Sequence, residues 1–111
     1  MKKRIGLGTW SWGNKLFWNY QKSNDSDLRE TFNESLKRGV DFFDTADSYG
    51  TGNLNGRSES LLGEFLLDTS SAQKNRIQIA TKLAPYPWRI GNKGFNKPFL
   101  ESLERLNNKL D

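Results

Sequence analysis

The 111-residue sequence contains no cysteine and no histidine. Without cysteine it has neither a disulfide framework nor a thiolate site, and metal binding is not expected. This composition fits a reducing compartment, so we predict a cytoplasmic protein. No apolar run approaches the ~20 residues that a membrane helix requires, and the segment after the basic start is too short and polar for a signal peptide. We therefore expect no membrane partner.

Charge of neither sign dominates the chain. Lysine and arginine number 17 against 13 aspartate and glutamate residues, which gives a net charge of +4. The basic residues are scattered, and the longest run is Lys2-Lys3-Arg4. No recognition-helix or aromatic-basic motif accompanies them, so the excess is typical of a solvated surface. A nucleic-acid module would rest on charge alone, and no nucleic-acid partner is predicted.

A pattern of strand, loop and helix recurs three times. Short apolar segments at Ile5 to Thr9, Val40 to Asp44 and Ile77 to Lys82 are predicted as strands. The second shows no clean alternation, which suits a parallel strand buried on both faces. We expect the strands to lie side by side in chain order, joined by right-handed crossovers.

Amphipathic helices are predicted after each strand. The first begins near Ser26 and stops at Gly39, and the second is capped by Ser58. The third begins near Asn96, with Pro98 in its first turn. Loops are expected between these elements, including a long aromatic loop over residues 10–25 and a polar stretch over residues 68–76.

Three ionisable side chains stand at or just after predicted strand ends: Asp44, Tyr49 and Lys82. Parallel strands share one carboxyl edge, which is where α/β sheets and barrels place their chemistry. A lysine ammonium beside a tyrosine stabilises the phenolate, and this makes the tyrosine a general acid. Alone, each residue has a structural alternative: a loop cap, a packing tyrosine or a solvated strand end. Their combination favours a catalytic interpretation.

Four segments carry a resemblance to a known family: GLGTW at 6–10, FDTADSYG at 43–50, GRSE at 56–59 and ATKL at 80–83. In this order and spacing they resemble the aldo/keto reductase family. The resemblance implies an α/β fold of the (β/α)8 TIM-barrel type, truncated to about the first three β/α units, because a complete barrel needs about 250 residues. We expect residues 1–111 to form one incomplete barrel domain, an amino-terminal fragment.

The resemblance also implies the chemistry, which is reduction of an aldehyde or ketone by hydride transfer from NADPH. Tyr49 would protonate the carbonyl oxygen, Lys82 would support Tyr49 electrostatically, and Asp44 would hold Lys82. Members of the family also use a histidine at the end of the fourth strand, and this sequence has none. The fragment alone is therefore expected to be inactive.

Cofactor contacts are implied where the first strand ends. Gly8, Thr9 and Trp10 match positions beside the nicotinamide and ribose of NADP, and Asp44 joins them. The alternative is that the glycines only allow the backbone to turn at the end of this strand. A dinucleotide-binding fingerprint is absent, because Gly6-Leu7-Gly8 lacks the third glycine that opens a helix.

Substrate contacts are expected from Trp10, Tyr49 and Trp88. The loops after the first and third strands are rich in aromatic rings, which either line a cleft for a small carbonyl substrate or pack the loops down. Many relatives carry an aromatic residue two positions after the strand-end lysine, where this chain has Ala84. The segments GTWSWGNKLFWNY and YPWR resemble the subgroup of plant chloroplasts and cyanobacteria, to which some pyridoxal reductases are similar.

A second class of function stays open on the sequence. A non-catalytic barrel relative, or a gene remnant, would act in binding if it acts at all. The intact set of Asp44, Tyr49 and Lys82 favours the enzyme, and no oligomeric state is predicted.

Overall fold

The computed structural model describes residues 4–52 and 55–111. Three strands, β1 (Gly6–Gly8), β2 (Phe42–Asp44) and β3 (Gln78–Ala80), form a parallel sheet in the order β1-β2-β3. The predicted strand order and direction are therefore confirmed. Each strand is shorter than predicted: β1 and β3 lose residues at both ends, and β2 begins two residues later but ends at Asp44 as predicted.

The register of the sheet brings the strand ends level. Gly8 pairs with Asp44, and Asp44 pairs with Ala80, so all three strands finish at one edge. Backbone bonds continue past them, from Thr9 N to the Asp44 carbonyl at 3.0 Å and from Thr45 N to the Ala80 carbonyl at 2.9 Å. The loops that follow start from a common, fixed edge.

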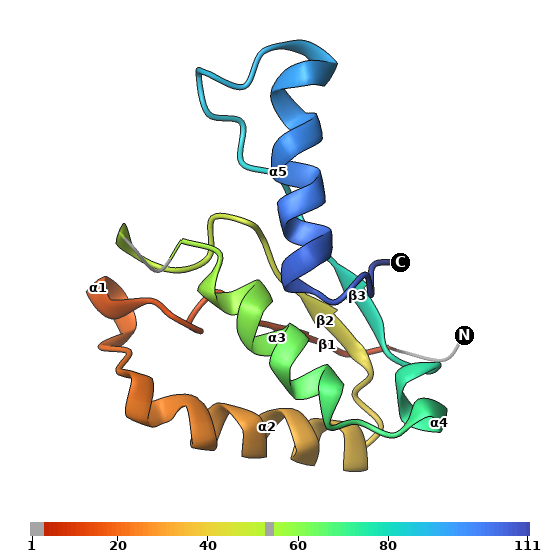
Figure 1. The fold of residues 1–111 in the computed structure, drawn as a ribbon. Coiled ribbons are helices and arrows are strands. Elements are labelled where there is room, and N and C mark those ends of the chain that lie inside the picture. The colour runs from red at the N-terminus through yellow and green to blue at the C-terminus, as the bar shows by residue number, and fades with distance from the viewer. Residues whose placement is uncertain (1–3, 53–54) are drawn as a thin grey trace.

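Helices and helical turns follow each of the three strands (Figure 1). In chain order they are α1 (Lys15–Trp18), η1 (Lys22–Asn24), α2 (Asp25–Lys37), α3 (Arg57–Leu67), α4 (Ser71–Lys74) and α5 (Gly91–Arg105). In the view of Figure 1, α3 crosses in front of the sheet and α2 runs beneath it. The core therefore forms between these two helices and one sheet face.

Aromatic rings fill this core. Phe32 of α2 is fully buried, with its ring centroid 4.9 Å from that of Phe43 in β2 and 5.6 Å from that of Phe65 in α3. Burial of such rings is the main source of stability in a small fold. Phe42 is only partly buried. The expectation that the second strand is covered on both faces is therefore wrong for the described residues.

Two helix starts differ from the predictions. Ser58 lies inside α3, whose N-cap is Gly56 at φ 82°, and its hydroxyl bonds to Thr9 instead of capping the helix. Helix α5 begins at Gly91, five residues before the predicted start at Asn96, so Pro98 lies in its interior. Proline there costs one backbone hydrogen bond, which the surrounding helix tolerates.

The first predicted helix is close to the observed one. Helix α2 begins at Asp25, one residue before Ser26, and Gly39 follows its end at φ 82° as predicted. Two segments predicted as loops contain single helical turns. In α1 the Asn14 side chain accepts from Phe17 N at 3.0 Å, and in α4 the Ser70 side chain caps the turn.

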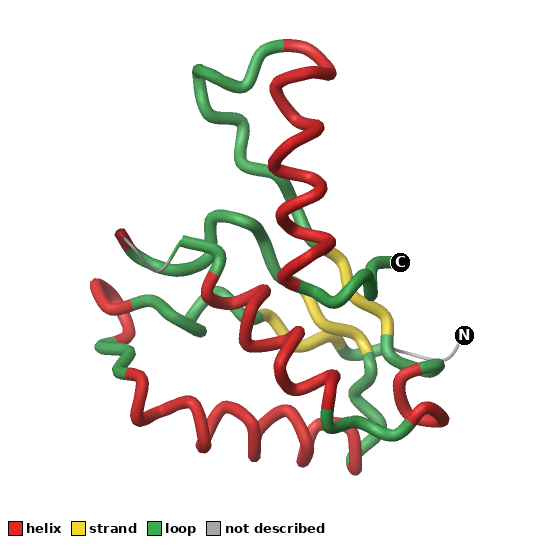
Figure 2. The backbone as a smooth tube through the Cα atoms, viewed as in Figure 1, coloured by secondary structure: helices red, strands yellow, loops and turns green. Residues whose placement is uncertain are grey.

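Helix α5 projects away from the sheet, and the loop that precedes it extends equally far (Figure 2). Only its C-terminal end packs on α3. Gly63 permits this contact, because a Cβ there would lie 1.9 Å from the Arg105 carbonyl oxygen. Among the described residues, no helix is both long enough and apolar enough to span a bilayer.

Candidate active site

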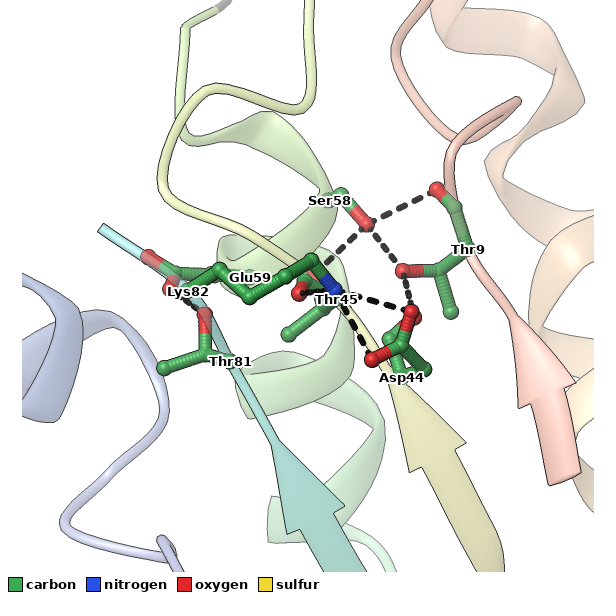
Figure 3. A network of polar contacts seen from close by, with 7 residues as sticks. All are labelled: Thr9, Asp44, Thr45, Ser58, Glu59, Thr81 and Lys82. Atoms are coloured by element: carbon green, nitrogen blue, oxygen red, sulfur yellow. Dashed lines mark hydrogen bonds and ion pairs between the residues drawn. The ribbon is translucent and has the colours of Figure 1, made fainter. Parts of the chain in front are cut away.

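Lys82 and Asp44 form an ion pair at the carboxyl edge of the sheet (Figure 3). The Lys82 Nζ atom donates to both carboxylate oxygens of Asp44, at 2.8 and 2.9 Å, and to the Thr45 carbonyl oxygen at 2.8 Å. Three acceptors, two on the last residue of β2 and one on the residue after it, thus hold an ammonium that follows β3. The strand pairing makes this possible, because it sets the two chain ends side by side.

The surroundings of Lys82 favour its charged form. Partial burial works to lower the pKa of Lys82, but the hydrogen bonds and negative charge of Asp44, followed by Tyr49, outweigh it and raise the pKa above the ordinary 10.5. The site therefore contains a permanent positive charge at neutral pH.

Tyr49 lies beside this charge. The Lys82 Nζ atom is 5.3 Å from the centroid of the Tyr49 ring. Backbone bonds fix the tyrosine, since its N–H donates to the Ala46 carbonyl at 3.2 Å and its carbonyl accepts from Ser58 N at 3.2 Å. The structure thus brings together the three residues predicted to be catalytic.

The positions predicted to hold the cofactor divide into two groups. Gly8 is exposed beside Asp44, and a Cβ added to it would meet nothing within 4 Å. Trp10 is 49% exposed. Thr9 is instead fully buried, and its hydroxyl donates to the Asp44 carbonyl oxygen at 3.0 Å. The Thr9 side chain therefore ties β1 to β2, whereas Gly8, Trp10 and the Asp44 carboxylate border open space.

The aromatic side chains also serve two purposes. Trp12 and Tyr20 pack into the core, as the packing alternative predicts. Trp10 stays at the surface, its ring centroid 5.9 Å from that of Phe17 and 6.3 Å from that of Trp18. These three rings form an exposed cluster on the loop after β1.

A second aromatic pair follows β3. Trp88 is 72% exposed and stacks on Tyr86 at 4.7 Å. Both rings line an open groove formed with residues of α1 and of the loop after β2: Leu16, Ser48, Gly50, Thr51, Gly52 and Asn55. Trp10 is not part of this lining. The predicted substrate residues Trp10 and Trp88 therefore do not share one pocket within the described part of the chain.

Partly buried charge pairs anchor the loops that carry these rings. Asp47 accepts from Arg89 Nη1 at 2.7 Å and from Ala84 N at 3.0 Å, which joins the loops after β2 and β3. Arg57 donates to Tyr20 Oη at 3.1 Å and to Asp25 at 2.5 Å, which joins the first loop to α3. Burial, followed by the hydrogen bond to Asp25, raises the pKa of Tyr20. The loops are therefore held in place by specific contacts.

Ser58 and Glu59 lie close to the ion pair in Figure 3, but neither was predicted from the sequence to belong to the site. Ser58 contacts Thr9 and Thr45, and Glu59 accepts from Thr81, the residue before Lys82. The available signal was their place in GRSE, one of the four segments that carry the family resemblance.

Three parallel β/α units with their polar residues at one carboxyl edge define an α/β protein of the kind found in open sheets and (β/α)8 barrels. A model of the aldo/keto reductase family matches residues 4–111. The chain belongs to this family.

Individual relatives agree with the assignment. The chloroplastic pyridoxal reductase of Arabidopsis thaliana is 48% identical over 104 residues, which is 92% of this chain and 28% of that protein. An uncharacterized oxidoreductase of Mycobacterium bovis is 36% identical over 94 residues, or 81% of this chain and 26% of that protein. The chain thus spans less than a third of each of these two relatives.

Solved structures show the same fold. A thermostable aldo-keto reductase crystallised with the inhibitor epalrestat superposes with a TM-score of 0.70 at 26% identity, covering 92% of this chain and 33% of that one. An aldo-keto reductase from Klebsiella pneumoniae in complex with NADPH gives 0.69 at 24% identity, covering 92% and 30%. The predicted barrel-type fold, limited to about three β/α units, is confirmed.

Proposed function

We propose that this chain provides the proton donor of a carbonyl reductase, an oxidoreductase that converts an aldehyde or ketone to an alcohol. The observation that carries the proposal is the position of the Lys82 ammonium, bound to Asp44 and 5.3 Å from the Tyr49 ring centroid. A tyrosine beside a fixed cation is suited to give up its proton, because the phenolate that forms is stabilised.

Each residue has one role in the proposed reaction. Tyr49 donates its phenolic proton to the carbonyl oxygen as negative charge develops there. Lys82 stabilises the resulting phenolate and stays protonated because its pKa is raised. Asp44 holds the ammonium in place by two hydrogen bonds. Since the pair is fixed before substrate arrives, little reorganisation is needed in the transition state.

NADPH is the proposed cofactor, and when bound it supplies the hydride that the carbonyl carbon accepts. The residues at the edge fit such a group. Gly8 leaves open space beside the Asp44 carboxylate, and the exposed Trp10 ring offers a flat apolar surface. We propose that Gly8, Trp10 and Asp44 border the cofactor, and that the fully buried Thr9 supports this edge from behind.

The proposed substrate is a small aromatic aldehyde or ketone. Trp88 and Tyr86 form one wall of a groove that Ser48 and Gly50, the chain neighbours of Tyr49, also line, and the stacked rings suit a planar partner. Because the Arabidopsis thaliana relative is named a pyridoxal reductase, pyridoxal is the first compound to test. We propose that Tyr49 completes the substrate contacts, whereas Trp10, which does not line this groove, is left to the cofactor.

The test uses a hybrid reductase, in which residues 4–111 replace the matching segment of the Arabidopsis thaliana pyridoxal reductase. We expect the hybrid to oxidise NADPH in the presence of pyridoxal or benzaldehyde. The 111-residue chain alone should show negligible turnover, because it contributes no histidine and too few strands for the whole cofactor surface. A folded hybrid without turnover would favour the binding-only alternative.

Two further proposals concern the whole protein. We propose that residues 1–111 form the amino-terminal part of a single barrel domain. We also propose a cytoplasmic location, supported by the absence of cysteine, although the Arabidopsis thaliana relative is named chloroplastic. Fractionation of the source cells tests the second, and recovery of the protein in an organelle would contradict it.

A further inference from the structure

Two adjacent residues in the first turn of α3, Ser58 and Glu59, are fully buried although both are polar. The proposed reaction uses neither of them. Among the described residues, every buried side-chain nitrogen and oxygen atom has a hydrogen-bond partner, so both side chains are satisfied. Their partners show what this turn of helix does.

Ser58 lies in the middle of a chain of hydroxyl groups. Its Oγ atom is 3.1 Å from Thr45 Oγ1 and 2.6 Å from Thr9 Oγ1, and Thr9 Oγ1 donates to the Asp44 carbonyl oxygen at 3.0 Å. If the protons follow one direction, Thr45 donates to Ser58, Ser58 to Thr9 and Thr9 to Asp44. In such a buried chain each hydrogen bond polarises its neighbours and strengthens them.

The hydroxyl chain ends on atoms next to the ion pair. Thr45 carries the carbonyl that accepts from Lys82 Nζ at 2.8 Å, and Asp44 carries the carboxylate that accepts the other bonds. Ser58 thus fixes the backbone at the end of β2, at the Asp44 carbonyl through Thr9 and at Thr45 directly. It does so without touching Lys82.

Glu59 makes the corresponding contact with β3. Its Oε1 atom accepts from Thr81 Oγ1 at 2.5 Å, and its Oε2 atom accepts from Arg105 Nε at 2.7 Å. The arginine compensates the buried negative charge, which leaves the other oxygen available for Thr81. Because Thr81 immediately precedes Lys82, this bond fixes the backbone from which the lysine side chain extends.

We propose that Ser58 and Glu59 are positioning residues for the Asp44–Lys82 pair. Adjacent side chains of one helical turn hold the ends of β1 and β2 on one side and of β3 on the other, as Figure 3 shows. A rigid helix therefore sets the separation of the carboxylate and the ammonium. The inference rests on the proposed function, since it explains how the charge beside Tyr49 is kept in place.

The test compares Thr81→Val with Thr81→Ser in the hybrid reductase. Valine has nearly the shape of threonine but removes the donor to Glu59, whereas serine keeps it. We expect Thr81→Val to lower kcat about tenfold or more, because a small displacement of a catalytic group slows the reaction by at least this factor. KM should change by less than about twofold. Its alkaline loss of activity should also move to lower pH, since a displaced Lys82 loses bonds that raise its pKa. Thr81→Ser should behave like the unmodified hybrid.

Ser58→Ala tests the other half and should also lower kcat with little change in KM. Asn107→Ala is the matched control, because it removes a 2.7 Å bond from Asn107 Nδ2 to the Gly63 carbonyl of the same helix, away from the strand ends. It should lower the melting temperature without changing kcat or the pH profile.

The outcomes separate this inference from the proposed function. An unmodified hybrid that lacks turnover, or one that is insensitive to Tyr49→Phe, contradicts the proposed function. An active, Tyr49-dependent hybrid in which Thr81→Val and Ser58→Ala lower only the melting temperature overturns the positioning role alone. If either variant fails to fold, the other decides.

Discussion

The Lys82 ammonium lies 2.8 Å from one carboxylate oxygen of Asp44 and 2.9 Å from the other. A third bond, to the Thr45 carbonyl oxygen, fixes the ammonium at the end of β2 although it belongs to the segment after β3. The position of the positive charge beside Tyr49 therefore depends on the pairing of β2 with β3.

Asp44→Asn should lower the pKa of Lys82. The carboxylate supplies the main contributions that raise this pKa, so burial, which lowers it, should dominate once the negative charge is gone. A raised lysine pKa adds stability below the unfolded value of about 10.4, and this stability is lost as pH rises through the folded value. The variant should lose both stability and activity at lower alkaline pH than the unmodified hybrid.

Lysine side-chain NMR of the hybrid measures this pKa directly, with Lys82→Arg identifying the signal. Asp41→Asn is a suitable control, because Asp41 pairs with Arg4 at the other end of β2. An Asp44→Asn variant in which the pKa of Lys82 is unchanged would show that the carboxylate does not raise that pKa.

Gly8→Ala should weaken NADPH binding without disturbing the fold. The added methyl group meets nothing within 4 Å in the structure, so the melting temperature should stay the same. If the cofactor occupies this space, crowding should raise its dissociation constant about tenfold. Fluorescence titration of the hybrid with NADPH measures the effect, and unchanged affinity would remove Gly8 from the cofactor site.

Trp88→Ala should affect substrate binding more than chemistry. Loss of one exposed aromatic contact corresponds to about a two- to tenfold rise in KM for an aromatic aldehyde, with kcat nearly constant. Ile90→Ala is the control, because Ile90 is 77% exposed and does not line the groove. A kcat that falls with constant KM would show that Trp88 has another role.

The 111-residue chain should self-associate when it is expressed alone. Ile90, Phe99 and Leu100 are 77%, 43% and 63% exposed on or next to α5, and β1 and β3 each have one pairing partner among the described residues. Light scattering after size-exclusion chromatography should detect the association, and Ile90→Lys with Leu100→Lys should reduce it. A monomer with sharp, dispersed amide signals and a cooperative melt would contradict this expectation.

Periodicity and strand-end residues predicted much of this fold. The apolar segments around Phe43 and Ile79 predicted two of the three parallel strands, and Gly39 predicted the end of the helix between the first strand and the second. Helix starts were less predictable, because tertiary contacts compete with local signals. Ser58 resembles an N-cap in the sequence, yet the buried Thr9 hydroxyl offers it a stronger partner and α3 begins before it.

The predicted catalytic residues come together for a simple reason. Asp44, Tyr49 and Lys82 lie at or beyond strand ends, so a parallel register was enough to make them neighbours. The supporting pairs could not be predicted in the same way. Glu59 with Arg105, and Asp47 with Arg89, join segments whose approach depends on the path of α5 and its loop.

The most direct test of the account is the effect of Tyr49→Phe on carbonyl reduction by the hybrid reductase. The substitution removes only the phenolic oxygen, while the Asp44–Lys82 pair keeps its bonds. Steady-state turnover of NADPH with pyridoxal should fall by ~10² or more, which is the usual contribution of a positioned general acid, and NADPH affinity should stay the same. Turnover that survives the substitution unchanged would contradict the assignment of Tyr49 as the proton donor.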